Sequence, residues 1–239
     1  LVRLKVDVIT TSGDQSTRAA QQATNTIPIV ANVGFPVESG FVKSLARPDG
    51  NITGFVALSD ALSAKRLELL KVLLPRLTRV AVLRDPVTHE RQPQAALEAA
   101  RTLGLQVQVL QARSANELAG AFETASAWRA EALLVLVSPT FTGNRADLVR
   151  LAARHRMPAM YPNAAFTEAG GLIAYGPAAE ELARIIAVAI DKILKGAKPA
   201  DIPFEQPTRF EMIVNLKTAK ALGIKIPGSI LVQATKVIE

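Results

Sequence analysis

Short apolar runs alternate with amphipathic segments along almost the whole sequence, and this alternation constrains the fold more than any other feature. The runs at 80–83 (VAVL) and 133–137 (LLVLV) are continuous, which is typical of strands that are covered on both faces. The segments at 60–74 and 178–195 repeat apolar residues at helical spacing. Strands that alternate with helices predict an α/β fold built from βαβ units, with parallel sheets and right-handed crossovers.

The same reading gives a location for each element. We expect helices at 15–24, 37–46, 60–74, 92–103, 114–128, 141–155, 178–195 and 215–222. We expect strands at 6–9, 27–31, 51–56, 79–83, 105–110, 132–137, 157–160, 172–175 and 210–214. Breaks near 52–58 and 172–177 divide the alternation into two parts. We therefore expect two lobes, each a parallel sheet flanked by helices, with a ligand between them and hinges near Gly54 and Gly176.

Composition narrows the class of protein. The 239 residues can bury a real core in one large or two small domains. The 28 basic and 21 acidic residues leave a net charge of +7, but the basic residues are scattered, which favours solvated helix faces over a nucleic-acid surface. Cysteine is absent, so disulfides and thiolate sites are excluded. No apolar run approaches the ~20 residues that span a bilayer.

The segment 157–177 delivers the only two tyrosines of the chain, Tyr161 and Tyr175, to the ends of two strands. A proline follows each of them within two residues, so the strand pairing stops there. Ligands of open α/β sheets bind at the C-terminal ends of strands, so both rings are candidate walls of a small-molecule cleft. The alternative is that both rings cap the core and bond locally.

Other strand ends carry polar residues. Thr11, Ser12 and Gly13 come between a strand and a helix and would suit an anion at the helix N-terminus, or else Ser12 or Asp14 simply caps that helix. Ser138 and Thr140 open a helix after the strand at 132–137. Asp85 follows a strand and could bond a ligand, or form an Asx turn without one. Together with Phe35, Tyr161 and Tyr175, these residues form the candidate ligand site.

Catalytic patterns are lacking. The two histidines, His89 and His155, fall in a loop and at a helix end, where a structural role explains them. No nucleophile elbow, zinc-protease motif or carboxylate pair at strand ends is present. We therefore expect a protein that is not an enzyme and that uses no metal or cofactor.

Several sequence blocks occur together, in order, in one protein family. They are 26–30 (TIPIV), 47–54 (RPDGNITG), 64–70 (AKRLELL), 151–155 (LAARH) through Tyr161-Pro162, 168–171 (EAGG), Tyr175-Gly176 and 210–223. On these blocks the chain resembles the substrate-binding proteins of ABC importers, in the group that includes tryptophan- and tyrosine-type binders. The resemblance implies a two-lobed periplasmic-binding-protein fold of type I-like architecture. The chain of such a protein crosses three times between lobes that close on a small ligand.

The resemblance also implies a division of the chain. Residues 1–56 would be the remainder of the N-lobe, 57–174 the C-lobe, 175–200 a return helix packing on the N-lobe, and 201–239 a segment crossing between the lobes. The family begins with a signal sequence and two further βα units, so we expect an incomplete first lobe here, a thin sheet with apolar residues such as Val8 and Ile29 poorly covered. It implies a periplasmic or extracytoplasmic location, ABC permease subunits as partners, and a membrane link only through the permease or an N-terminal anchor.

These expectations combine into a functional hypothesis. The chain would capture an aromatic acid or an amino-acid-like ligand and deliver it to a permease. The alternative is the ligand-sensing effector domain of a regulator with the same fold. The family usually reads Gly-Asp-Pro where this chain has Gly34-Phe35-Pro36, so the partner of a ligand's ammonium group is replaced. We therefore expect a carboxylate without an α-amine to be preferred. The alternative is that Phe35 merely packs under its loop and that Asp14 or Asp85 binds the amine.

Overall fold

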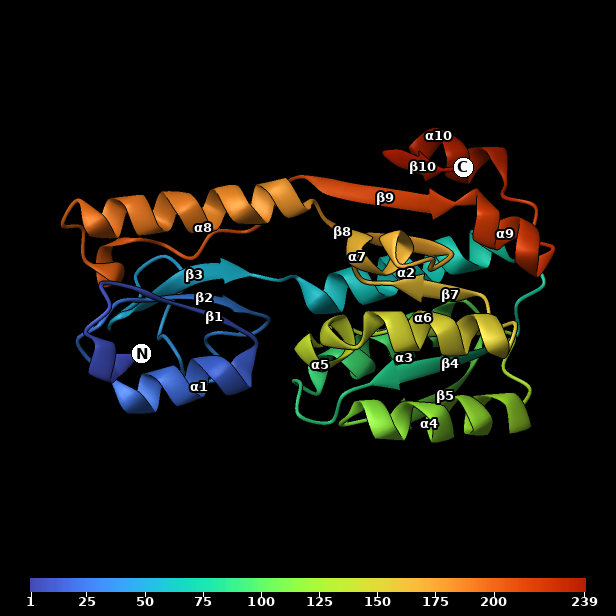
Figure 1. The fold of residues 1–239 in the computed structure, drawn as a ribbon, viewed down its shortest axis with the longest axis horizontal. Helices are drawn as coiled ribbons and strands as arrows, with labels where there is room; N and C mark the ends of the chain where they lie inside the picture. Colours follow the sequence, from blue (N-terminus) through green and yellow to red (C-terminus); the bar gives the residue numbers. More distant parts are fainter. The chain divides into compact units, whose positions relative to one another are not determined.

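The computed structural model describes residues 1–239, which form two compact units (Figure 1). Unit 1 comprises residues 1–58 and 179–209, and unit 2 comprises residues 59–178 and 210–239. The chain therefore passes between the units three times, after residues 58, 178 and 209. The boundaries predicted from the sequence lie after residues 56, 174 and 200. Residues 201–209 belong to unit 1 and residues 210–239 to unit 2.

Unit 1 is a three-stranded parallel sheet with helices against it, in the strand order β1-β2-β3. Strand β2 is central, and its side chains alternate between two cores. Ile29 packs with Phe41, Ile52 and Phe204 on one face, while Val30 packs against α8 on the other. Its elements are η1 (Val2–Leu4), β1 (Ile9–Ser12), α1 (Asp14–Ala23), β2 (Ile29–Val33), β3 (Ile52–Val56), α8 (Ala179–Leu194) and η2 (Pro199–Asp201).

Unit 2 is a seven-stranded sheet in the order β10-β9-β8-β7-β6-β4-β5. Every neighbouring pair is parallel except β8 and β9, because β9 follows a crossing from unit 1 and not a crossover helix within unit 2. Its elements are α2 (Ser59–Leu73), β4 (Arg79–Arg84), α3 (Arg91–Thr102), β5 (Gln106–Gln111), α4 (Ala115–Ala127), β6 (Ala132–Val135), α5 (Pro139–Gly143), α6 (Arg145–Arg154), β7 (Ala159–Tyr161), α7 (Ala164–Glu168), β8 (Ile173–Pro177), β9 (Phe210–Asn215), α9 (Leu216–Leu222), α10 (Gly228–Gln233) and β10 (Lys236–Ile238).

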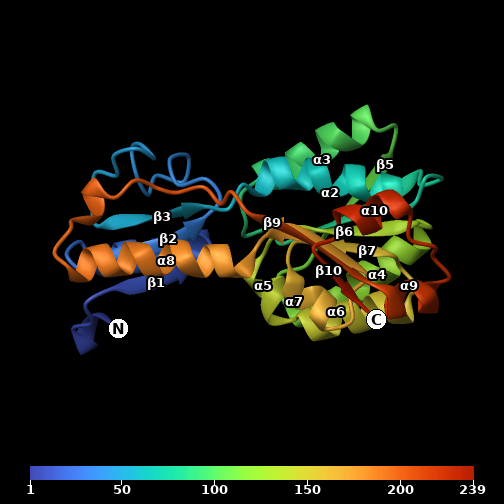
Figure 2. The same cartoon turned by 90° about the horizontal axis from the view of Figure 1, so that it is seen from above.

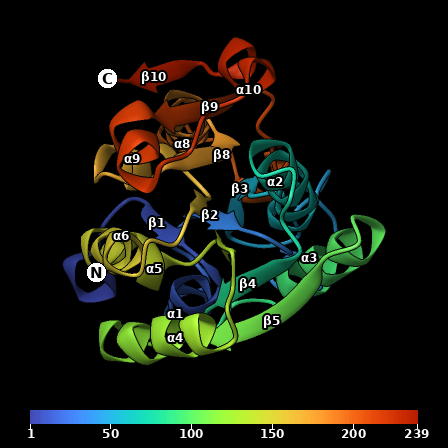
Figure 3. The same ribbon diagram turned by 90° about the vertical axis from the view of Figure 1, so that its right-hand side faces the viewer.

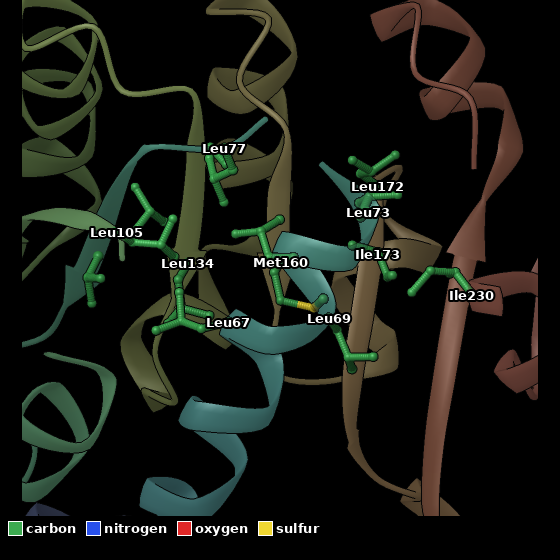
Figure 4. Close-up of a cluster of buried hydrophobic side chains, with 14 of the residues drawn as sticks. Leu67, Leu69, Leu73, Leu77, Leu105, Leu134, Met160, Leu172, Ile173 and Ile230 are labelled. Carbon is green, nitrogen blue, oxygen red and sulfur yellow. The ribbon is translucent and has the colours of Figure 1, made fainter. Parts of the chain in front are cut away.

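Helices flank both faces of this sheet, α2 and α3 on one side and α4 and α6 on the other (Figure 2), and a hydrophobic core lies under each layer. On one face, leucines of α2 meet β-strand residues such as Leu134, Met160 and Ile173 (Figure 4). On the other face, Phe122 of α4 and Leu148 of α6 pack over Leu133 and Val135. The strands β4 and β6 are buried on both faces, as their continuous apolar runs predict. The predicted α/β class with parallel sheets flanked by helices is confirmed.

Four local predictions need correction. The first strand begins at Ile9, later than 6–9, because β1 pairs Thr10 and Thr11 with β2. The predicted helix 37–46 is absent: the N–H groups of Phe41 and Val42 both bond the carbonyl of Pro36, and Gly40 has a φ of 71°. The predicted helix 141–155 is two helices that meet at Asn144, where the Asn side chain donates to the Thr140 carbonyl.

The fourth correction concerns a predicted hinge. Gly54 lies in the middle of β3, paired with Ala31 of β2, so it is part of the sheet of unit 1 and precedes the crossing after residue 58 by four residues. The expectation that Ile29 would be poorly covered in a thin sheet is also wrong, since its side chain is 0% exposed between the flanking segments.

Candidate functional site

In open α/β sheets, ligands bind at the C-terminal edge, where loops follow the strands. In unit 1 this edge carries Thr11, Ser12 and Gly13. The Thr11 hydroxyl lies 2.8 Å from that of Thr17, and the Ser12 hydroxyl accepts from the Asn32 amide at 3.4 Å. Gly13 is the N-cap of α1 with a φ of 85°, in the left-handed region that favours glycine, and its N–H donates to the Asn32 carbonyl at 2.8 Å.

No side chain caps α1, so the alternative in which Ser12 or Asp14 is the cap is wrong. Asp14 is the first helical residue, and its carboxylate accepts from the Ser39 hydroxyl at 2.6 Å. Phe35 lies in the turn that follows β2. Its side chain is buried, and its carbonyl accepts from the Ser39 N–H at 2.9 Å. The predicted residues of unit 1 thus lie at one edge of its sheet.

In unit 2, Asp85 and Ser138 come together from the ends of adjacent strands β4 and β6. Both are 1% exposed, and the Ser138 hydroxyl donates to the Asp85 carboxylate at 2.8 Å. Asp85 also accepts from the Val87 N–H at 3.1 Å, which is the predicted Asx turn. Ser138 caps α5 by accepting from the Phe141 N–H. Thr140 lies in the first turn of α5 and is half-buried.

Ser138→Ala should lower the free energy of unfolding by about 1–3 kcal/mol, because a buried carboxylate loses its hydroxyl donor and α5 loses its cap. Urea denaturation followed by fluorescence would measure this. Thr140→Ala is the matched control in the same loop, and no hydrogen bond of its hydroxyl is present, so we expect a change within about 0.5 kcal/mol. Equal effects of the two variants would show that the Asp85–Ser138 bond contributes nothing.

The two tyrosines lie on adjacent strands but on opposite faces of the sheet. Tyr161 is 1% exposed, belongs to the same core as Phe122, and stacks on Phe166 with ring centroids 4.9 Å apart. Burial raises the pKa of the Tyr161 hydroxyl. Tyr175 is half-buried against the other core and stacks on Phe210 at 6.2 Å. Tyr161 is paired with Ala174, the residue before Tyr175, and neighbouring residues of a strand point to opposite faces. The prediction that both rings form walls of one cleft is therefore wrong.

Arg66 is a residue that the sequence analysis missed. Its side chain is 0% exposed, and its Nε donates to the Tyr175 carbonyl at 2.7 Å, while Nη2 donates to the Pro162 carbonyl at 3.2 Å. The buried Nη1 has no hydrogen-bond partner. Burial lowers the pKa of Arg66 to about 9, so the guanidinium remains protonated at neutral pH. Arg66 thus holds the ends of β7 and β8 together.

The signal for Arg66 was present in the sequence. Leu62 and Leu70 lie four residues to either side of it, so Arg66 falls on the apolar face of α2, whereas its neighbour Lys65 falls outside it. A second buried arginine, Arg84, could not be recognised from the sequence pattern. It is 6% exposed at the end of β4 and forms a bidentate ion pair with Glu90, which lowers the pKa of that carboxyl.

The sequence matches one family of known proteins along almost its whole length. Residues 1–238 match the family described as ABC transporter substrate binding protein. The chain belongs to this family. Proteins of this family and fold are substrate-binding proteins and not enzymes. No helix in the structure combines the length and apolar character needed to cross a membrane.

Individual relatives support the assignment. A tyrosine-binding protein of Clostridioides difficile is 28% identical over 225 residues, which are 92% of this chain and 64% of that protein. The chain thus spans somewhat less than two thirds of the length of this curated relative. The crystal structure of an ABC domain from Streptococcus pneumoniae in complex with L-Trp is 27% identical, with a TM-score of 0.88 over 100% of this chain and 81% of that one.

A second structure supports the fold alone. A conserved domain protein from Vibrio cholerae is 24% identical, with a TM-score of 0.89 over 99% of this chain and 80% of that one. The fold is therefore that of the type I periplasmic binding proteins, which confirms the architecture predicted from the sequence blocks.

Proposed function

We propose that this chain is the solute-binding component of an ABC importer and delivers a small organic ligand to a permease. The observation that carries the proposal is the family match along residues 1–238, with relatives whose names state that they bind tyrosine or tryptophan. A protein with this role works outside the cytoplasm, and it needs no catalytic group, cofactor or metal. The effector domain of a regulator remains the second candidate on the fold alone.

The ligand contacts proposed from the sequence lie at the C-terminal edges of the two sheets, except for the core ring of Tyr161. In unit 1 they are Thr11, Ser12, Gly13 and Phe35. In unit 2 they are Asp85, Ser138 and Thr140, with Tyr175 near the crossing after residue 178. The hydroxyls and the uncapped N-terminus of α1 would favour an anionic group such as a carboxylate.

A thermal-shift screen tests the role itself. Amino acids, aromatic acids and small carboxylates should be compared, because a ligand at 100 times its Kd stabilises the folded state by roughly 2.7 kcal/mol. We expect at least one aromatic acid to raise the Tm. If no compound of these classes does so, a solute-binding role for small carboxylates is contradicted.

We predict that a carboxylate without an α-amine binds more tightly than the matching amino acid. The family resemblance implies an aspartate at the position of Phe35 as the partner of a ligand's ammonium group. A charge-assisted hydrogen bond of that kind contributes roughly 1.5–3 kcal/mol, or about 10- to 150-fold in Kd. Calorimetry with tryptophan and indole-3-propionate, and with tyrosine and its deaminated analogue, measures the preference directly.

Phe35→Asp should reverse this preference, and Phe35→Leu is the control for loss of the ring without a new charge. Tighter binding of the amino acid by the unsubstituted protein would overturn the prediction. In that case Asp14 or Asp85 becomes the candidate partner of the ammonium group.

A further inference from the structure

The positive charge of the protein is concentrated at one edge of unit 2. Unit 2 holds 18 of the 28 basic residues and 12 of the 21 acidic residues, so it carries most of the net charge. Six connections lead into the N-terminal edge of its sheet, which Figure 3 views end-on: 71–79, 101–105, 128–131, 154–158, 168–172 and 216–225. They contain ten basic residues, namely Lys71, Arg76, Arg79, Arg101, Arg129, Arg154, Arg156, Lys217, Lys220 and Lys225.

These connections hold only two acidic residues, and both are engaged. Glu131 accepts from the N–H groups of Thr78 and Arg79 and forms an ion pair with the Arg79 side chain at 3.3 Å. Glu168 lies 3.7 Å from Lys236. The opposite edge of the same sheet is close to neutral, with Arg84, Arg91, Arg113 and Arg145 beside Asp60, Asp85, Glu90, Glu117 and Glu211. The charge of unit 2 is therefore polarised along its strands.

Helix macrodipoles explain only part of this pattern. Arg101 and Arg154 lie in the last turns of α3 and α6, where a cation is favoured. Lys217 lies in the first turn of α9, at the end where the macrodipole disfavours a cation. Arg76 and Lys225 lie outside helices, and they are exposed. The excess of cations thus points to an external anionic partner.

The same edge contains an apolar groove of about 490 Å³. Leu73, Leu74, Leu77 and Ile224 supply its apolar walls, and Arg76 and Lys225 line it from two different connections. Trp128, the only tryptophan of the chain, is the half-buried C-cap of α4 and begins the connection 128–131 at the same edge. Tryptophan beside cations and apolar groups is typical of proteins at a membrane–water interface.

We propose that this N-terminal edge of the sheet of unit 2 docks on an anionic phospholipid surface. The exposed cations of this edge face the phosphate groups, and the groove contacts the apolar part of the interface. Lys71 donates to the Leu77 carbonyl and Arg79 is paired with Glu131, so these two contribute less. A diffuse array of cations from six connections suits a laterally mobile anionic surface, because such a surface adapts to the positions of the cations. An acidic protein would instead have to match them in shape. This proposal does not depend on the identity of the transported solute.

Flotation with lipid vesicles tests the proposal. We expect the full chain to bind vesicles of phosphatidylglycerol and phosphatidylcholine at low salt and to be released from them by about 1 M salt. It should not bind vesicles of phosphatidylcholine alone. The triple variant Arg76→Gln, Lys220→Gln, Lys225→Gln should lower the partition coefficient about a hundredfold, at about fivefold for each cation. The structure contains no ion pair of these three side chains, so folding should be unaffected.

The matched control removes three exposed cations of unit 1, as Arg47→Gln, Lys192→Gln, Lys198→Gln, and should bind within about threefold of the parent protein. Brominated phosphatidylglycerol should quench Trp128 fluorescence on binding. Three results would overturn the proposal: no flotation with anionic vesicles, equal losses in both triple variants, or binding to polyglutamate without binding to vesicles. The last of these would assign the edge to an acidic protein partner.

Discussion

Arg66→Ala should lower the free energy of unfolding of unit 2 by about 3–5 kcal/mol. The substitution leaves the carbonyls of Tyr175 and Pro162 without their charged donors and opens a cavity where a large, fully buried side chain was. Both carbonyls lie at strand ends beside Gly176, where even an added Cβ would overlap the Pro162 carbonyl oxygen, so little room exists for rearrangement. Urea denaturation followed by the fluorescence of Trp128 reports unit 2 directly.

Two comparisons make the Arg66 result interpretable. Lys65→Ala, one residue earlier on α2, removes an exposed side chain with a weak pairing to Glu68, and its effect should stay within about 0.5 kcal/mol. Arg66→Met keeps much of the volume and removes the buried charge, so it should cost less than Arg66→Ala. If Arg66→Met were neutral, the two hydrogen bonds to Tyr175 and Pro162 would contribute nothing net to stability.

Gly54→Ala should destabilise unit 1 by about 3–6 kcal/mol, the sum of backbone strain and overpacking. Gly54 has a φ of 151°, which side chains rarely adopt, and an added Cβ would overlap the carbonyl of Ala31 on the adjacent strand. The strands β2 and β3 would have to separate to admit a methyl group. Unit 1 contains no tryptophan, so far-UV circular dichroism should lose amplitude before the fluorescence of Trp128 changes.

Gly120→Ala is the matched control for the glycine variant. Gly120 lies within α4, and nothing lies within 4 Å of an added Cβ. Alanine is the better helix former there, so we expect stabilisation by about 0.5–1 kcal/mol. Coincident loss of circular dichroism and fluorescence in Gly54→Ala would contradict separate unfolding of the two units. An unchanged midpoint would contradict the steric argument itself.

Much of this fold was predictable because periodicity is a local property. The continuous runs at 80–83 and 133–137 form β4 and β6, and the helical spacing of 60–74 and 178–195 gives α2 and α8 nearly residue for residue. The prediction of a helix at 37–46 was wrong because its apolar residues are buried by a turn. Phe41 and Val42 are both buried, and their N–H groups bond the carbonyl of Pro36, so they do not form the apolar face of a helix. Such a turn depends on contacts with β2 that no local pattern encodes.

The site was less predictable because side-chain direction and pairing are not local. The end of β7 was found, but not that Tyr161 turns into the core while Tyr175 turns to the other face. The contact between Asp85 and Ser138 joins residues 53 positions apart, and only the order of the strands brings them together. Arg66 could have been found from its place between Leu62 and Leu70, whereas its two carbonyl partners could not.

The interrupted course of unit 1 has a consequence for its biosynthesis. The Thr53 hydroxyl donates to the carbonyl of Ile202, 149 residues later in the chain, and α8 covers Val30 from beyond the whole central block of unit 2. At roughly 5–20 residues per second, the ribosome needs on the order of 10 s to supply these partners. During that interval one apolar face of β1, β2 and β3 lacks its covering helix, so unit 1 cannot complete its core until residue 202 has been synthesised.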